Sequence, residues 1–113
     1  MKFSFKNDYS EGCHPKILEA LSQYNLDQQN GYGLDIYSEN AANIIREKSK
    51  SPESKVHLVS GGTQANLIVI SSILRPHESV VSANTSHIFT NEAGAIEATG
   101  HKVHGVETPD GKL

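Results

Sequence analysis

The second half of the chain alternates short β-type runs with longer helical patterns of apolar residues. Residues 56–59 form a β-type run, and the apolar positions of residues 63–74 recur at helical spacing immediately after it. A second strand is predicted over residues 79–83, a second helix over residues 88–99, and a third strand over residues 102–107. Strands that alternate with helices predict right-handed crossovers and a mostly parallel sheet covered by helices, which is an α/β fold.

The first part of the chain, residues 1–54, predicts a loop followed by two helices. Pro15 suits the first turn of one helix, and residues 37–49 predict another with Ser38 as its N-cap. Pro52 ends this pattern because proline has no backbone N–H to donate. The apolar positions of the first helix are Ile17, Leu18 and Leu21, and those of the second that we expect to face inward are Ala41, Ile44 and Ile45.

These patterns divide the chain into two regions. Residues 1–54 are an N-terminal loop with helices, and residues 55–113 are the first half of an α/β sheet domain. Residues 108–111 have the composition of a turn, after which such a domain continues with a further element. We therefore expect the chain of 113 residues to be the N-terminal portion of a longer protein.

Charge and composition argue against several classes of partner. The net charge is −3 and no cluster of Lys and Arg occurs, so we expect no nucleic-acid or membrane partner. No apolar run approaches the roughly 20 residues of a membrane span, and the first residues lack the apolar stretch of a secretory signal. The single cysteine, Cys13, fits a cytoplasmic protein. His101 and His104 fall on opposite faces of a strand, so we expect no metal ion there.

A glycine-rich turn, Ser60-Gly61-Gly62-Thr63, lies between the first predicted strand and the helix that follows it. The N–H groups at a helix N-terminus lack partners, and the helix dipole favours an anion there. Glycines let the main chain approach the anion closely, and the Thr63 hydroxyl adds a donor. A bound phosphate is the interpretation we favour, and the alternative is a tight turn that packs the helix on the strand. The spacing fits neither a Walker A motif nor a dinucleotide fingerprint.

His87 follows the second predicted strand, and ligands of open α/β sheets gather beyond the carboxyl ends of the strands. Its ring is therefore expected to share a crevice with the glycine turn and to contact a flat, phosphate-bearing cofactor. The alternative is a solvated or capping histidine. Glu92 lies five residues further on, and its carboxylate faces either the same crevice or solvent.

Four segments carry a recognisable combination of motifs. In order they are Phe5-Lys6-Asn7-Asp8, Gly31-Tyr32-Gly33-Leu34-Asp35, Ser60-Gly61-Gly62-Thr63-Gln64-Ala65-Asn66 and Ser86-His87-Ile88-Phe89-Thr90-Asn91-Glu92-Ala93-Gly94. They are similar to Phe-Arg-Ser-Asp, Val-Tyr-Gly-Glu-Asp, the phosphate loop Pro-Ser-Gly-Thr-Met-Ala-Asn, and Ser-His-Ile-x-x-x-Glu-x-Gly. These motifs belong to the N-terminal part of the low-specificity L-threonine aldolase and β-eliminating lyase family. The resemblance implies the aspartate-aminotransferase fold, with residues 55–113 in the cofactor-binding large domain.

The same resemblance implies pyridoxal 5'-phosphate as cofactor and assigns site residues. His87 would stack on the pyridine ring and take part in proton transfer at the substrate hydroxyl, with Glu92 supporting it. Asn7 stands where a family serine contacts the substrate carboxylate. The implied reaction is retro-aldol cleavage of a β-hydroxy amino acid such as threonine, in a homodimer or homotetramer. The residues implied for the cofactor are Gly61, Gly62, Thr63 and His87.

Two departures from the family pattern qualify this assignment. Gly61 and Asn7 each replace a family serine, so one donor in the phosphate loop is absent and the substrate contact is altered. The lysine that family enzymes join to the cofactor lies beyond residue 113, so we expect this chain to be inactive by itself. The alternatives are another enzyme of the same fold, namely an aminotransferase, a cysteine desulfurase or a β-elimination lyase, or a non-catalytic binding or assembly module.

Overall fold

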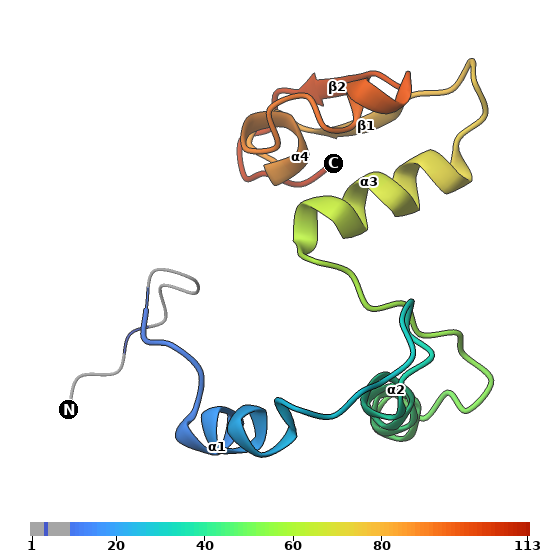
Figure 1. Cartoon of the computed structure of the whole chain (residues 1–113). Coiled ribbons are helices and arrows are strands. Elements are labelled where there is room, and N and C mark those ends of the chain that lie inside the picture. The colour runs from blue at the N-terminus through green and yellow to red at the C-terminus, as the bar shows by residue number, and fades with distance from the viewer. Residues whose placement is uncertain (1–3, 5–9) are drawn as a thin grey trace. The chain divides into compact units, whose positions relative to one another are not determined.

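The structure is a computed structural model that describes residue 4 and residues 10–113. The chain divides into two compact units, Met1–Val56 and His57–Leu113. Figure 1 shows helices in the first unit, and helices with a pair of parallel strands in the second. The predicted combination of helices with parallel strands is therefore confirmed.

Two helices make up the first unit, and both begin at a side-chain cap. Helix α1 (Pro15–Tyr24) begins at His14, whose Nδ1 accepts the Lys16 N–H at 3.2 Å. Helix α2 (Ile36–Lys48) begins at Asp35.

The Asp35 carboxylate accepts the Ser38 N–H at 2.8 Å and the Ser38 hydroxyl at 2.6 Å. The prediction that Ser38 is the N-cap is thus wrong. A carboxylate three residues earlier reaches the third amide of the helix, and its charge complements the helix dipole.

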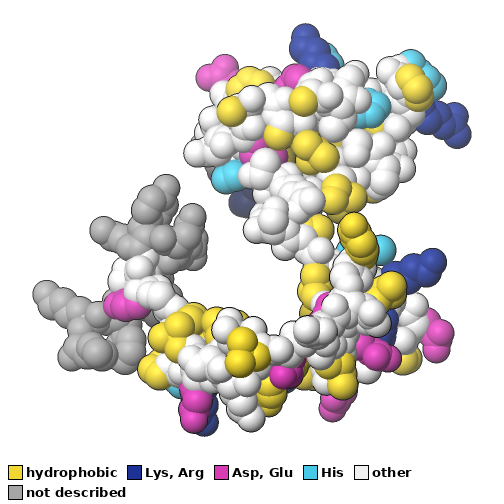
Figure 2. Space-filling model, in the orientation of Figure 1, with side chains coloured by type: hydrophobic (Ala, Val, Ile, Leu, Met, Phe, Trp, Pro, Cys, Tyr) yellow, Lys and Arg dark blue, Asp and Glu magenta, His cyan; other side chains and the backbone are white. Residues whose placement is uncertain are grey.

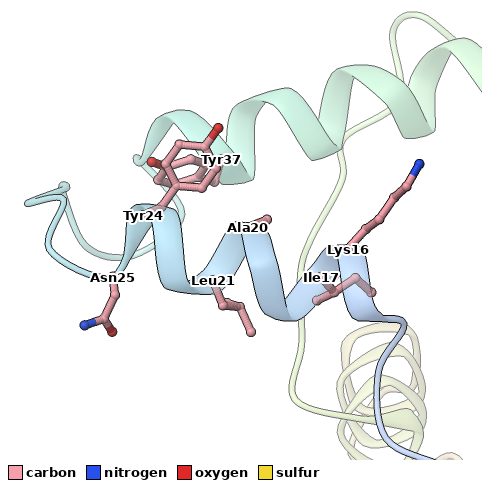
Figure 3. Close-up of a pocket in the computed structure, with 7 residues that line it drawn as sticks. All are labelled: Lys16, Ile17, Ala20, Leu21, Tyr24, Asn25 and Tyr37. Atoms are coloured by element: carbon pink, nitrogen blue, oxygen red, sulfur yellow. The ribbon is translucent and has the colours of Figure 1, made fainter.

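Most apolar side chains of α1 and α2 are exposed in this unit. Ile44 and Ile45 were expected to face inward and do not, whereas Ala41 is half-buried. Leu21 is 61% exposed and Ile44 is 53% exposed. The Tyr24 and Tyr37 rings pack with their centroids 5.2 Å apart, beside a groove of about 750 Å³ that includes Ile17 and Leu21 (Figure 3). Helical spacing identified a shared face correctly, but spacing carries no information about what covers it.

The Tyr37 hydroxyl ties the start of α2 to the segment that follows α1. It donates a hydrogen bond to the Asp27 carboxylate at 2.5 Å. This bond and the neighbouring negative charge raise the pKa of Tyr37 to about 12.

The second unit places one helix before a short parallel sheet. Helix α3 spans Gly62–Ile73, strand β1 spans Val80–Ala83 and strand β2 spans Val103–Val106. The two strands are parallel and in register, so that Val80 lies opposite Val103. Both strands and α3 agree with the predicted spans to within one or two residues.

The connection between the strands consists of two short helices. They are α4 (His87–Thr90) and the 3₁₀-helix η2 (Glu97–Thr99). Figure 1 shows α4 against the strand pair. Between the two helices, Ile96 is completely buried, and Val103 of β2 is 4% exposed.

The predicted strand over residues 56–59 does not form within the described part of the chain. Leu58 is 58% exposed and Val59 is 42% exposed. A strand needs a neighbouring strand to satisfy its backbone groups, and a β-type composition does not supply one. The segment is therefore unpaired, and β1 and β2 form a sheet of two strands.

The predicted helix over residues 88–99 is also wrong, because the chain leaves the helical conformation after four residues. Ala93 has φ = 50° and Gly94 has φ = 81°, both in the left-handed region. A positive φ at a non-glycine residue costs free energy and is retained only where surrounding contacts hold it. Helix α4 ends at Thr90, and the turn at Ala93 and Gly94 follows Glu92, whose side chain is buried.

Gly105 of β2 allows the ring of Phe89 in α4 to lie directly on the strand backbone. A Cβ added at Gly105 would lie 2.7–2.9 Å from three atoms of that ring. Gly105→Ala is therefore expected to displace the ring and lower the thermal midpoint of the intact protein, at a cost of about 1–2 kcal/mol. Gly12→Ala is the matched control, because no described atom lies within 4 Å of a Cβ there. Equal midpoints for the two variants would contradict this packing.

No helix among the described residues is both long and apolar enough to cross a bilayer. Within the same residues, no three His, Cys, Asp or Glu side chains are grouped as metal ligands would be. His101 is buried, and its Nδ1 donates to the Glu78 carbonyl at 3.1 Å, which fixes the start of the sheet.

Candidate active site

The N-terminus of α3 presents amides that no side chain caps in the described part of the chain. Gly61 is the N-cap residue, and its φ of 173° is ordinary extended backbone. The Gln64 side chain turns back and accepts both the Ser60 N–H at 2.7 Å and the Ser60 hydroxyl at 2.8 Å. No hydrogen bond among the described residues uses the amides of Gly61, Gly62 or Thr63. These donors are available to an anion.

The two glycines of this turn are not required by packing inside the described part of the chain. No described atom lies within 4 Å of a Cβ placed at Gly61 or Gly62. A tight turn that packs α3 on a strand was the alternative interpretation, and the strand it needs is not formed. The open space at both Cβ positions leaves room for a ligand to approach the main chain.

Glu92 carries the buried charge of the second unit. Its side chain is 0% exposed, and its Oε1 accepts the Asn66 Nδ2–H at 2.6 Å. The same Oε1 lies 2.9 Å from His87 Nδ1. The other oxygen, Oε2, is buried and has no hydrogen-bond partner among the described residues.

The pKa of Glu92 reflects two opposing effects. Burial by itself raises the pKa, whereas the hydrogen bonds from Asn66 and His87 and the charge of a protonated His87 lower it. The hydrogen bonds and the His87 charge together outweigh burial. The pKa of Glu92 therefore lies below its usual value, and the carboxylate is ionised at neutral pH. An ionised carboxylate accepts hydrogen bonds and donates none.

His87 is the first residue of α4, and its side chain contacts the buried Glu92 carboxylate on one side and solvent on the other. Its side chain is 65% exposed while that of Glu92 is fully buried. Ser86 occupies the N-cap position, but its hydroxyl donates to the Ser82 hydroxyl at 2.9 Å instead of capping α4. The loop is thus tied to β1, and the ring is held through one nitrogen while the rest of it faces outward.

Asn66 is the residue that the sequence interpretation missed. It is the fifth residue of α3, about 6 Å along the helix axis from Gly62. Through Glu92 it connects the helix that begins at the glycine turn with His87, so all three lie in one unit. The available signal was one amide within the apolar run Ala65–Ile70. Asn7, the candidate for the substrate carboxylate, lies outside the described residues.

Comparison with known families identifies the chain. A family model described as beta-eliminating lyase matches residues 8–113. The chain belongs to the beta-eliminating lyase family. The resemblance inferred from the four motifs is thereby confirmed.

Relatives of this beta-eliminating lyase chain include two low-specificity L-threonine aldolases. The one from a Pseudomonas species is 30% identical over 111 residues, and the one from Pseudomonas aeruginosa is 28% identical over 111 residues. Each alignment covers 96% of this chain and 32% of the relative. The chain therefore spans about a third of the length of these curated relatives.

A solved structure, the threonine aldolase of Leishmania major, has the same fold over this region. It is 52% identical, with a TM-score of 0.89, over 99% of this chain and 33% of that protein. The family match begins at residue 8. It includes the glycine turn, Asn66, His87 and Glu92, and it leaves out Asn7.

Proposed function

We propose that this chain supplies part of the active site of a pyridoxal-phosphate-dependent lyase that cleaves β-hydroxy amino acids, threonine into glycine and acetaldehyde. The observation that carries the proposal is the connected group Asn66–Glu92–His87, which couples an exposed imidazole to the helix with the free N-terminal amides. Similarity to threonine aldolases from three sources supports the choice of substrate.

The cofactor phosphate is assigned to the N-terminus of α3. The amides of Gly61, Gly62 and Thr63 and the Thr63 hydroxyl are donors without partners in the described residues, which suits a dianion beside a helix dipole. The open space at both glycines allows the close approach that a phosphate needs. When bound, the cofactor supplies the electron sink for the carbanion left by cleavage of the Cα–Cβ bond.

His87 is assigned two tasks, to cover the cofactor ring and to take the proton of the substrate β-hydroxyl at Nε2. Nδ1 faces the buried Glu92 carboxylate, so Nε2 is the nitrogen left for a ligand. Glu92 keeps the ring oriented and stabilises the positive charge that it gains with the proton.

The remaining assignments concern residues and surfaces outside this group. We propose that Asn7 contacts the substrate carboxylate and that the intact protein is a homodimer or homotetramer. Exposed apolar side chains on α1 and α2 support the assembly (Figure 2). We also propose that residues 1–54 and 55–113 act as separate structural regions, the second belonging to the cofactor-binding domain.

The experiment that tests this function is incubation of the intact protein with L-threonine and other β-hydroxy amino acids, with and without added pyridoxal phosphate. We expect glycine and the matching aldehyde in equal amounts, and loss of both products when the cofactor is removed. Release of ammonia and a keto acid instead would assign a β-elimination lyase, and transfer of the amino group would assign an aminotransferase. No cofactor binding at all would leave a non-catalytic module.

We also propose that residues 1–113 alone are inactive. Borohydride treatment with pyridoxal phosphate is expected to label no lysine of this range specifically, because the family's cofactor lysine stands in a motif that these residues lack. Glycine release by the isolated chain would contradict this.

A further inference from the structure

The side chain of Asn66 is an amide in an apolar stretch of helix, and it makes a long-range hydrogen bond. It reaches across 26 positions of sequence to Glu92, at 2.6 Å between Nδ2 and Oε1. An amide nitrogen can only donate, so the Glu92 oxygen that faces it must accept. That oxygen is the same one that faces His87 Nδ1.

The contact with Oε1 determines which nitrogen of His87 carries the hydrogen. An ionised carboxylate offers only lone pairs, so each group hydrogen-bonded to Oε1 must donate, and Asn66 holds this oxygen in place. His87 Nδ1 must then carry the hydrogen, and a neutral ring has its free lone pair on Nε2.

The second oxygen does not offer another arrangement. Oε2 is buried without a partner in the described residues, so rotating the carboxylate gains no hydrogen bond there. Asn66 therefore selects the oxygen that His87 contacts, although it does not touch His87 in any recorded hydrogen bond.

We propose that Asn66 is a positioning residue that holds Glu92 Oε1 against His87 Nδ1. Because the carboxylate can only accept, this contact keeps the hydrogen on Nδ1 and leaves Nε2 as the basic nitrogen presented to the ligand. This inference rests on the proposed function for its catalytic meaning. The tautomer itself is a property of the protein and can be measured without turnover.

The test exchanges donor and acceptor between the two positions. In Glu92→Gln, Asn66 still donates, so the side-chain carbonyl of the introduced glutamine is held toward His87 and Nδ1 keeps its hydrogen. In the double variant Glu92→Gln/Asn66→Asp, the new aspartate accepts instead, and the NH₂ group of the introduced glutamine serves both neighbours. His87 Nδ1 then becomes the acceptor, and the hydrogen moves to Nε2.

The readout is the rate at which diethylpyrocarbonate modifies His87 in the cofactor-free intact protein at pH about 8, where an ordinary imidazole is neutral. This reagent acylates an imidazole nitrogen that has a free lone pair. Nδ1 faces the buried side chain at position 92, so Nε2 is the nitrogen that the reagent can reach on the exposed ring. Mass spectrometry of the digest follows the His87 peptide, and the exposed His104 peptide is the internal reference. We expect Glu92→Gln to react like the native protein, and the double variant to react about tenfold more slowly, the factor expected from a hydrogen bond of ordinary strength.

The matched control for the Asn→Asp change is Asn43→Asp in the Glu92→Gln background. Asn43 is used as an acceptor, since Arg46 Nη1 donates to its Oδ1 at 2.8 Å, and aspartate keeps that acceptor. The control should react like Glu92→Gln.

Equal rates for Glu92→Gln and the double variant, both with native melting curves, would overturn the inference. If the double variant does not fold, Glu92→Gln/Asn66→Leu replaces it. Leucine removes the donor without adding charge, so slower modification than in Glu92→Gln supports the proposal and an unchanged rate overturns it. Failure of the proposed function appears separately, as absence of lyase activity in the native protein whatever the modification rates are.

Discussion

Replacing His87 by phenylalanine in the intact protein is expected to lower kcat/KM for β-hydroxy amino acids by about 10²–10⁴-fold, the usual effect of losing a positioned general base. Phenylalanine keeps a flat ring that can cover the cofactor, but it has no nitrogen to take the substrate proton. The ring is 65% exposed and makes one hydrogen bond within the described part of the chain, so its loss affects the thermal midpoint much less than the rate. The measurement is steady-state kinetics together with thermal unfolding.

His87→Ala separates the two tasks assigned to the ring. Alanine removes both the nitrogen and the flat surface, so it should match phenylalanine in its loss of cleavage and exceed it in loss of cofactor affinity. His104→Phe is the matched control, because His104 is an exposed histidine on β2 with no assigned role. Native activity in both His87 variants would remove this residue from the mechanism.

Local signals predicted the elements of this chain well where a residue's own neighbours decide the conformation. Pro15 begins α1, and Gly100, with φ = 91°, ends the η2 turn, because each has a backbone preference that few environments override. Strands β1 and β2 were found because their apolar runs are bounded by turns on both sides.

Predictions failed where a distant partner decides. The run 56–59 has strand composition but no partner strand among the described residues, and the helix expected over residues 88–99 gives way to a turn at Ala93 and Gly94. Glu92 directly precedes that turn, and its side chain is hydrogen-bonded to Asn66 of another helix. The spacing of apolar residues along the sequence carries no information about such a long-range contact.

The candidate site shows the same division. Glycines at a helix N-terminus and a histidine after a strand follow from local rules, so Gly61, Gly62 and His87 could be proposed from sequence. The sequence could not decide whether the Glu92 carboxylate faces solvent or the interior, because that depends on hydrogen bonds with Asn66 and His87. The role of Asn66 could not be predicted either, because it depends on a hydrogen bond to a residue 26 positions away. A polar residue in an apolar helical run is the signal to examine in comparable sequences.

The second large effect is expected from Gly62→Asp at the first residue of α3. This substitution should favour the helix but weaken binding of the cofactor. Asp in the first turn complements the helix dipole and favours the helix by about 0.3–1 kcal/mol, so the cofactor-free form keeps or raises its thermal midpoint. The same carboxylate occupies the position assigned to the cofactor phosphate. Repulsion between unit charges about 4 Å apart near a protein surface is of order 4 kcal/mol, so pyridoxal phosphate should bind at least about 100-fold more weakly.

Two variants distinguish charge from shape in this experiment. Gly62→Ala has room for its methyl group within the described atoms, so its affinity for pyridoxal phosphate should lie between the native and aspartate values. Gly12→Asp introduces the same charge at a position with equal free space and no part in the proposed site, and it should bind like the native protein. The dissociation constant comes from absorbance titration of the cofactor-free intact protein. Native affinity in Gly62→Asp would show that the phosphate binds elsewhere, because a carboxylate close to the phosphate would repel it.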